Sequence, residues 1–230
     1  MFAGLIDFET NANGYIPADN EVIALTDIFS IDNINIRFGF DSNMNGIINK
    51  EAVFENTGEI GDTNDTAFWV RNASKDTAAP GYETLLGDYF LRQFEPYKPF
   101  GQFVILHESN LPVTAASGEI WDIDGGNNTE QFLVQAFNEG QLLESMYSPL
   151  GNNRKLDGKP WTFTFNNLSN ITKITIDFTG SKRNGLGIAF NNFSAETGVS
   201  ALTTEVPEPK SVWLFGLVIL VYLKLRTAGN

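Results

Sequence analysis

The sequence predicts an all-β protein, an antiparallel β-sandwich of the jelly-roll kind, and three observations lead to that prediction. Apolar and polar residues alternate with a period of two along several short segments, as in half-buried strands. Turn-forming pairs (Asn-Gly, Gly-Gly and Asn-Asn) separate these segments. Aromatic residues make up 13% of the 230 residues, and 19 of them are Phe, which favours strands over helices. No strand–helix alternation is visible, so neither a Rossmann fold nor a TIM barrel is expected.

The clearest predicted strand covers residues 34–40, where Ile34, Ile36 and Phe38 alternate with polar residues. Residues 162–165 and 171–178 alternate in the same way. The other predicted strands, in chain order, are 4–9, 66–71, 88–93, 101–107, 118–124, 130–137, 141–147 and 186–193. Many short strands with frequent turns indicate two packed sheets or a barrel.

Composition excludes several classes of function. The formal net charge of −13 argues against nucleic acid as a partner, because binding phosphates needs clustered Lys and Arg. With no Cys, the chain has no disulfide, thiol nucleophile or Cys-ligated metal. His107 is the one histidine and is interpreted as a strand-end residue with a local hydrogen bond. The serine-hydrolase elbow and the phosphate-binding loop motifs are also absent.

The chain divides into an acidic body and an apolar tail. We assign residues 1–203 to the β-sandwich, 204–211 to a linker that contains Pro207-Glu208-Pro209, and 212–230 to a hydrophobic helix with a basic end. Twelve consecutive apolar residues, 212–223, would form a helix of roughly 18 Å, short against a hydrocarbon core of about 30 Å. The alternative is a buried terminal helix or strand of the body.

The tail resembles the PEP-CTERM sorting signal of exported bacterial proteins. The resemblance rests on three ordered parts: a Pro-Glu-Pro tripeptide, an apolar helix and a basic end. The residues concerned are Val206, Pro207, Glu208, Pro209, Lys224 and Arg226. It implies recognition by an exosortase at the membrane, processing near the tripeptide, and a final place at the cell surface or in the extracellular exopolysaccharide.

Basic residues at the extreme C-terminus would stay cytoplasmic and leave the body outside. The segment from Met1 to Asp7 lacks the basic start of a secretory signal. Export would need such a signal, so we expect an in-frame signal peptide upstream of Met1.

The body resembles the β-sandwich domains found in such exported proteins, and jelly-roll carbohydrate-binding modules. The first resemblance rests on segments 118–125, 130–132 and 187–193, and the second on Ile6-Asp7-Phe8-Glu9 and Phe190-Asn191-Asn192-Phe193. It implies contact with polysaccharide. It also implies a structural Ca²⁺ held by Glu9, by Asn191 and by loop carbonyls, for which residues 41–46 are a possible source.

A second calcium hypothesis rests on the 41–46 loop itself. Asp41, Asn43 and Asn45 stand at positions 1, 3 and 5, and Gly46 at position 6, as in an EF-hand or dockerin loop. Position 12, however, is Ala52. The alternative is an Asn-Gly hairpin without metal.

Aromatic side chains could form a platform for stacking sugars. The tryptophans considered are Trp69, Trp121 and Trp161. We expect most of them in the core, including Trp69, which lies among apolar neighbours.

The function predicted from the sequence is that of a non-enzymatic exported protein at the cell surface or in the extracellular matrix. An exported carbohydrate-active enzyme is the alternative. Asp122 and Asp124 would lie on one face of a strand, with side chains roughly 7 Å apart from the two-residue rise. That separation suits an inverting glycosidase. A strand end entering a turn is the competing interpretation of these two residues.

Overall fold

The computed structural model describes residues 4–58, 66–70, 75–96, 101–125, 128–152, 156–183, 186 and 188–198. The predicted linker, the apolar segment and the sorting-motif residues 206–209, 224 and 226 lie outside the described residues. Within the described part, no helix is long and apolar enough to cross a membrane.

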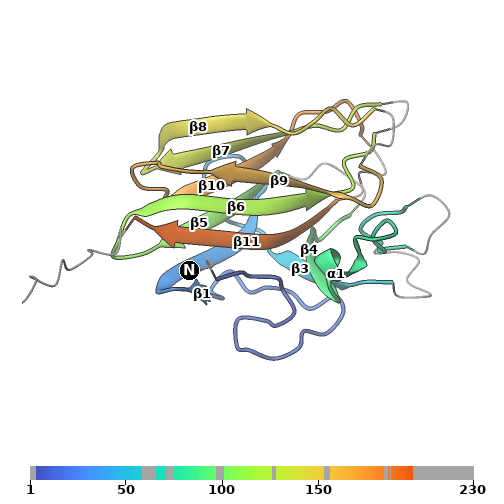
Figure 1. Cartoon of the computed structure of the whole chain (residues 1–230), viewed down its shortest axis with the longest axis horizontal. Helices are drawn as coiled ribbons and strands as arrows, with labels where there is room; N and C mark the ends of the chain where they lie inside the picture. Colours follow the sequence, from blue (N-terminus) through green and yellow to red (C-terminus); the bar gives the residue numbers. More distant parts are fainter. Residues whose placement is uncertain are drawn as a thin grey trace, which may run out of the picture. The chain divides into compact units, whose positions relative to one another are not determined.

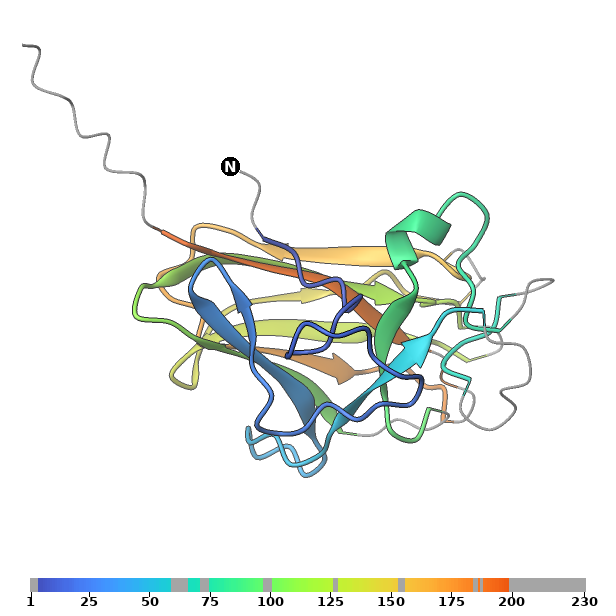
Figure 2. The ribbon, with the colours of Figure 1, turned by 90° about the horizontal axis from the view of Figure 1, so that it is seen from below.

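Two antiparallel sheets pack face to face, which confirms the predicted all-β sandwich (Figures 1 and 2). The six-stranded sheet has the order β1 (Phe29–Ile31), β2 (Ile34–Asp41), β5 (Gln102–Glu108), β10 (Lys173–Phe178), β7 (Phe132–Asn138) and β8 (Gln141–Tyr147). The five-stranded sheet has the order β3 (Ala52–Asn56), β4 (Tyr89–Gln93), β11 (Ala189–Thr197), β6 (Val113–Trp121) and β9 (Pro160–Phe165). A single-turn helix, α1 (Glu83–Leu86), precedes β4.

Most predicted strands are confirmed, but two predicted segments are not strands and two short strands lie outside the prediction. Residues 4–9 form only an isolated bridge, at Ile6, and residues 66–70 form only one at Trp69, while residue 71 lies outside the described residues. The strands β1 and β3 lie outside the prediction, because β1 has only three residues and β3 buries four consecutive residues without alternation.

The inner core between the sheets is dominated by phenylalanine. Phe8, Phe38, Phe103 and Phe193 are each 1–2% exposed. The ring of Phe193 contacts the other three, and Phe8 also contacts Phe38. Alternation alone would point Phe190 and Phe193 to opposite faces. A bulge in β11, where the register shifts between residues 191 and 194, turns both rings inward.

A second, smaller core lies on the outer face of the five-stranded sheet. In β4, β6 and β11, residues adjacent to inner-core positions point outward. Residues from the described ranges 66–70 and 75–86 cover them. Together they form the outer cluster: Ala67, Phe68, Val70, Ala78, Leu86, Phe90, Trp121 and Ala189. Beside this cluster, buried Arg92 donates through Nε to buried Glu55.

Candidate functional site

Asp122 and Asp124 lie in a turn rather than along a strand. Strand β6 ends at Trp121, and Asp122 has a left-handed φ of 66°. The N–H of Asp124 donates to the carbonyl of Asp122 at 2.9 Å. The turn therefore ends the alternation that the sequence analysis extended through residue 124.

The turn gathers carboxylates from two loops. One carboxylate oxygen from each of Asp122, Asp124 and Asp157 lies within 4.8 Å of the others. Such an arrangement could accept a metal ion. These oxygens lie closer together than the roughly 7 Å expected for Asp122 and Asp124 along a strand, which was the spacing on which the glycosidase hypothesis rested. The geometry therefore does not favour the glycosidase hypothesis.

Burial controls the electrostatics of this turn. Asp122 is 4% exposed, and its Oδ1 accepts a 2.7 Å hydrogen bond from the N–H of Gly158. Burial, and then the charge of Asp124, raise the pKa of Asp122 well above its ordinary value. Burial and the neighbouring Glu130 raise the pKa of Asp124 to about 6, while Lys182 opposes the shift.

Glu130 and Lys182 complete the arrangement. Glu130 is fully buried, and its Oε2 accepts hydrogen bonds from the N–H groups of Asp124 (2.8 Å) and Gly125 (3.1 Å). Lys182 Nζ donates to Glu130 Oε1 and lies 3.7 Å from Asp124 Oδ1. Sequence reasoning found Asp122 and Asp124 only, because Asp157, Glu130 and Lys182 come from separate segments and no local spacing links them.

The predicted pair Glu9 and Asn191 converges on the segment that joins α1 to β4. Glu9 Oε1 accepts hydrogen bonds from the N–H groups of Asp88 (2.8 Å) and Tyr89 (3.3 Å). Asn191 donates through Nδ2 to the carbonyl of Leu86 at 2.7 Å. A Cβ on Gly87 would lie 2.0 Å from Glu9 Oε1, so this close approach requires glycine.

A cleft of about 360 Å³ opens beside Glu9. Asn192 lines it and donates through Nδ2 to the carbonyl of Leu85 and to Glu119 Oε2. The carboxylate of Glu9 and the side-chain amides of Asn191 and Asn192 thus contact residues 85–89, and carboxylate and carbonyl oxygens are among the ligands that Ca²⁺ prefers. The carbonyl groups beside Glu9 come from this segment rather than from residues 41–46.

The 41–46 loop closes on itself. The carboxylate of Asp41 accepts hydrogen bonds from the N–H groups of Asn43 and Gly46. Asn45 Oδ1 accepts one from the N–H of Ile47 at 3.0 Å. These bonds satisfy an Asn-Gly turn without metal, and calcium binding here stays a prediction.

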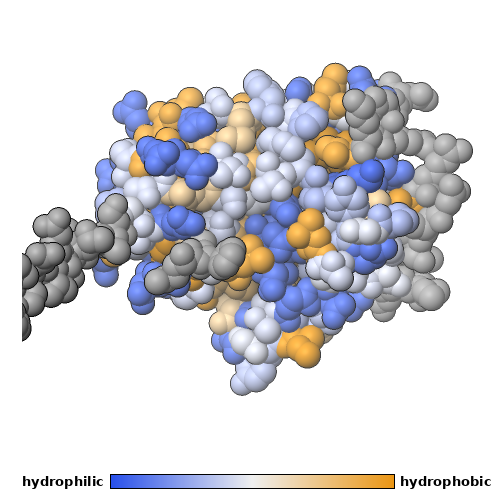
Figure 3. Space-filling view, in the orientation of Figure 1, coloured by the Kyte–Doolittle hydropathy of each residue, from blue (hydrophilic) through white to orange (hydrophobic). Residues whose placement is uncertain are grey.

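The three tryptophans occupy different environments. Trp121 is fully buried and Trp161 is partly buried, whereas Trp69 is 68% exposed. The expectation that Trp69 belongs to the core was wrong. Its neighbours Phe68 and Val70 fill the outer cluster and leave its indole on the solvent side. On the face seen in Figure 3, hydrophobic residues form small separate patches among hydrophilic ones.

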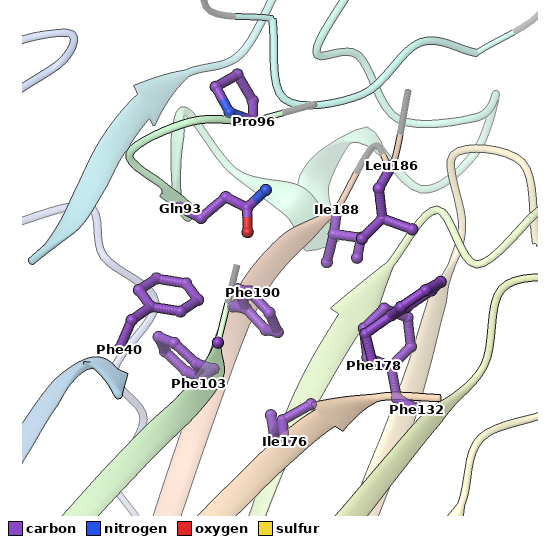
Figure 4. Close-up of a pocket in the computed structure, with 11 residues that line it drawn as sticks. Phe40, Gln93, Pro96, Phe103, Phe132, Ile176, Phe178, Leu186, Ile188 and Phe190 are labelled. Carbon is purple, nitrogen blue, oxygen red and sulfur yellow. The ribbon is translucent and has the colours of Figure 1, made fainter. Parts of the chain in front are cut away.

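A narrow pocket at one end of the inner core offers little room for a ligand. Phe40, Phe103 and Phe190 line it, and the last two stack with centroids 4.3 Å apart (Figure 4). Its volume of about 30 Å³ holds a water molecule or two. We interpret it as a packing gap.

Comparison with known proteins adds little. No protein-family model matches the chain, and no curated protein matches it. Among solved structures, the K1 cleaved adhesin domain of Lys-gingipain from Porphyromonas gingivalis W83 aligns with 86% of this chain and 99% of that chain. The identity is 12% and the TM-score is 0.32, too distant a likeness to support an argument about fold or function.

Proposed function

We propose that this chain is an exported, non-enzymatic β-sandwich protein of the bacterial cell surface or extracellular matrix, where it contacts polysaccharide. The observation that carries the proposal is the order of parts in the tail: Pro207-Glu208-Pro209, twelve apolar residues, then Lys224 and Arg226. An all-β body without cysteine and with a surplus of acid suits a soluble module among anionic polymers.

Sorting is tested with a secretory signal peptide fused before Met1 and expression in a host that has an exosortase. The wild type should appear outside the cell, with its tail removed near residues 207–209. The double variant Pro207→Ala/Glu208→Ala should keep its tail and stay with the membrane fraction. A matched host without exosortase should retain the tail of both chains. Equal processing of the two chains in the first host would contradict the proposal.

Contact with polysaccharide is proposed to use the exposed indole of Trp69, because aromatic faces stack on the apolar faces of sugars. The probe is an array of neutral and acidic bacterial polysaccharides. Trp69→Ala should weaken binding by about tenfold or more, whereas Phe94→Ala, at a residue that is 63% exposed, should not. The same array reports release of reducing sugar. Release that is lost in Asp122→Asn would favour the enzyme alternative.

A structural Ca²⁺ is proposed beside Glu9, where Asn191 and the carbonyl groups of residues 85–86 supply further oxygens. When bound, the ion would tie the N-terminal segment and β11 to the α1–β4 connection. Added Ca²⁺ should raise the melting temperature of the wild type, and Glu9→Gln should abolish that rise. The matched variant Asp41→Asn should retain it. The reverse pattern would assign the ion to the 41–46 loop.

A further inference from the structure

Three side chains from three segments meet at one end of the sandwich, and each is held in place by the main chain. The N–H of Lys182 donates to the carbonyl of Thr129 at 3.1 Å, as does that of Ser181 at 2.9 Å. This pairing places Lys182 beside Glu130, the residue that follows Thr129. Glu130 in turn accepts the N–H groups of Asp124 and Gly125. The Lys182 amine and the carboxylates of Glu130 and Asp124 are therefore preorganised.

We propose that Lys182 and Asp124 become joined by an intramolecular amide bond, with Glu130 transferring the protons. Lys182 Nζ donates to Glu130 Oε1 and lies 3.7 Å from Asp124 Oδ1, so the amine is held beside the carboxyl group that it would attack. Glu130 is fully buried, and the side chains of Lys182 and Asp124 are only 18% and 14% exposed. Low exposure keeps competing water away from the reacting groups.

The proposed step balances without an added reagent. Glu130 takes a proton from the Lys182 ammonium, and the nitrogen lone pair attacks Cγ of Asp124 to form the C–N bond. The C–O bond breaks with its electron pair on oxygen, and Glu130 delivers protons from the nitrogen to that oxygen, which leaves as water. An ammonium and a carboxylate thus become an amide and one water, and Glu130 returns to its starting state.

The position of the bond gives it a structural consequence. Asp124 follows β6 of the five-stranded sheet, and Lys182 follows β10 of the six-stranded sheet. The amide would join the two sheets covalently in a chain that has no cysteine. It would act as a disulfide does, by restricting the unfolded chain, but no reductant would open it. This inference is independent of the proposed function.

The test is the intact mass of the full chain, made in a host without exosortase and measured in denaturant with a chelator. The wild type should be lighter than its sequence by one water, and its protease digest should contain a branched peptide that joins residues 124 and 182. Lys182→Arg and Glu130→Gln should both have the full mass. Lys159→Arg, the matched control, should show the loss of water.

Three results would overturn the proposal or part of it. A wild type of full mass would show that the three residues form only an ion-paired cluster, even if a divalent metal raises its melting temperature. A cross-link that persists in Lys182→Arg would place the bond elsewhere. A cross-link that persists in Glu130→Gln would remove the assigned role of Glu130. The wild-type mass decides the matter if a variant fails to fold.

Discussion

The inner core and the outer cluster solve the same burial problem with different chemistry. Between the sheets, phenylalanine rings pack on one another in edge and stacked contacts. Under residues 66–70 and 75–86 the cluster is smaller, and ionisable groups are buried around it, including Asp76 at 2% exposed and Arg92 at 2% exposed. The comparison teaches that the interior between the sheets is stabilised mainly by ring packing, whereas buried ionisable groups such as Asp76, Glu55 and Arg92 accompany the outer cluster.

The largest expected effect breaks the inner core. Phe193→Ala removes a ring that contacts Phe8, Phe38 and Phe103, and it should lower the free energy of unfolding by about 4 kcal/mol. Urea denaturation at neutral pH measures this. Phe94→Ala, at an exposed ring, should change stability by less than about 0.5 kcal/mol. Similar losses from the two variants would mean that Phe193 is not an inner-core residue.

The next effect breaks the outer cluster. Arg92→Met leaves Glu55 as a buried carboxylate without its guanidinium partner, and should cost about 3 kcal/mol. The double variant Glu55→Met/Arg92→Met removes both charges and should regain most of that loss. Hydrogen exchange at the Phe68 amide, which donates to Asp76, should accelerate in the single variant. A double variant that is no more stable than Arg92→Met would contradict the coupling between Glu55 and Arg92.

The pH dependence of Asp76 sharpens the comparison. Burial raises its pKa to about 7, although hydrogen bonds from the N–H groups of Phe68 and Ala67 oppose the shift. The native state keeps a proton that the unfolded chain loses near pH 4, so stability should fall as pH rises from about 4 to 7. The slope is at most about 1.4 kcal/mol per pH unit. Asp76→Asn should remove this component in urea titrations at several pH values.

His107 makes stability depend on pH with the opposite sign, and over a narrower pH range. It lies on the inward side of β5, two residues beyond Ile105, and its Nδ1 accepts no hydrogen bond among the described residues. Burial lowers its pKa to about 4. The unfolded chain takes up a proton below about 6.5, so stability should fall as pH drops from 6.5 to 4, again by at most about 1.4 kcal/mol per unit. His107→Phe should flatten this acid limb.

The sequence predicted the strands of the inner core well and the outer cluster poorly. Alternation in residues 34–40 carries its own signal, because every second residue meets the facing sheet. The described residues 66–70 are also rich in apolar side chains but form no strand, because they lie over the outer face of a sheet, where Phe68 is buried and Trp69 is exposed. The local hydrophobic pattern does not predict which face of a sheet an irregular segment will pack against.

The candidate sites show the same limit. Asp122 and Asp124 stood out as neighbours in sequence, and a turn at the strand end was one of their two interpretations. Their separation, however, depends on the left-handed conformation of Asp122, which the sequence analysis did not predict. The hydrogen bond predicted for His107 is not made by Nδ1, which has no hydrogen-bond partner among the residues that the structure describes. Contacts between distant segments, such as Lys182 with Glu130, have no signature in spacing.

The bulge in β11 couples two parts of the molecule that sequence distance keeps apart. One extra residue lets both Phe190 and Phe193 fill the interior and, at the same place, leaves Asn191 and Asn192 to bind the carbonyl groups of Leu86 and Leu85. Repacking beneath the bulge would thus be transmitted to the rim of the cleft beside Glu9. A ligand seated in that cleft would, by reciprocity, stiffen the centre of the fold.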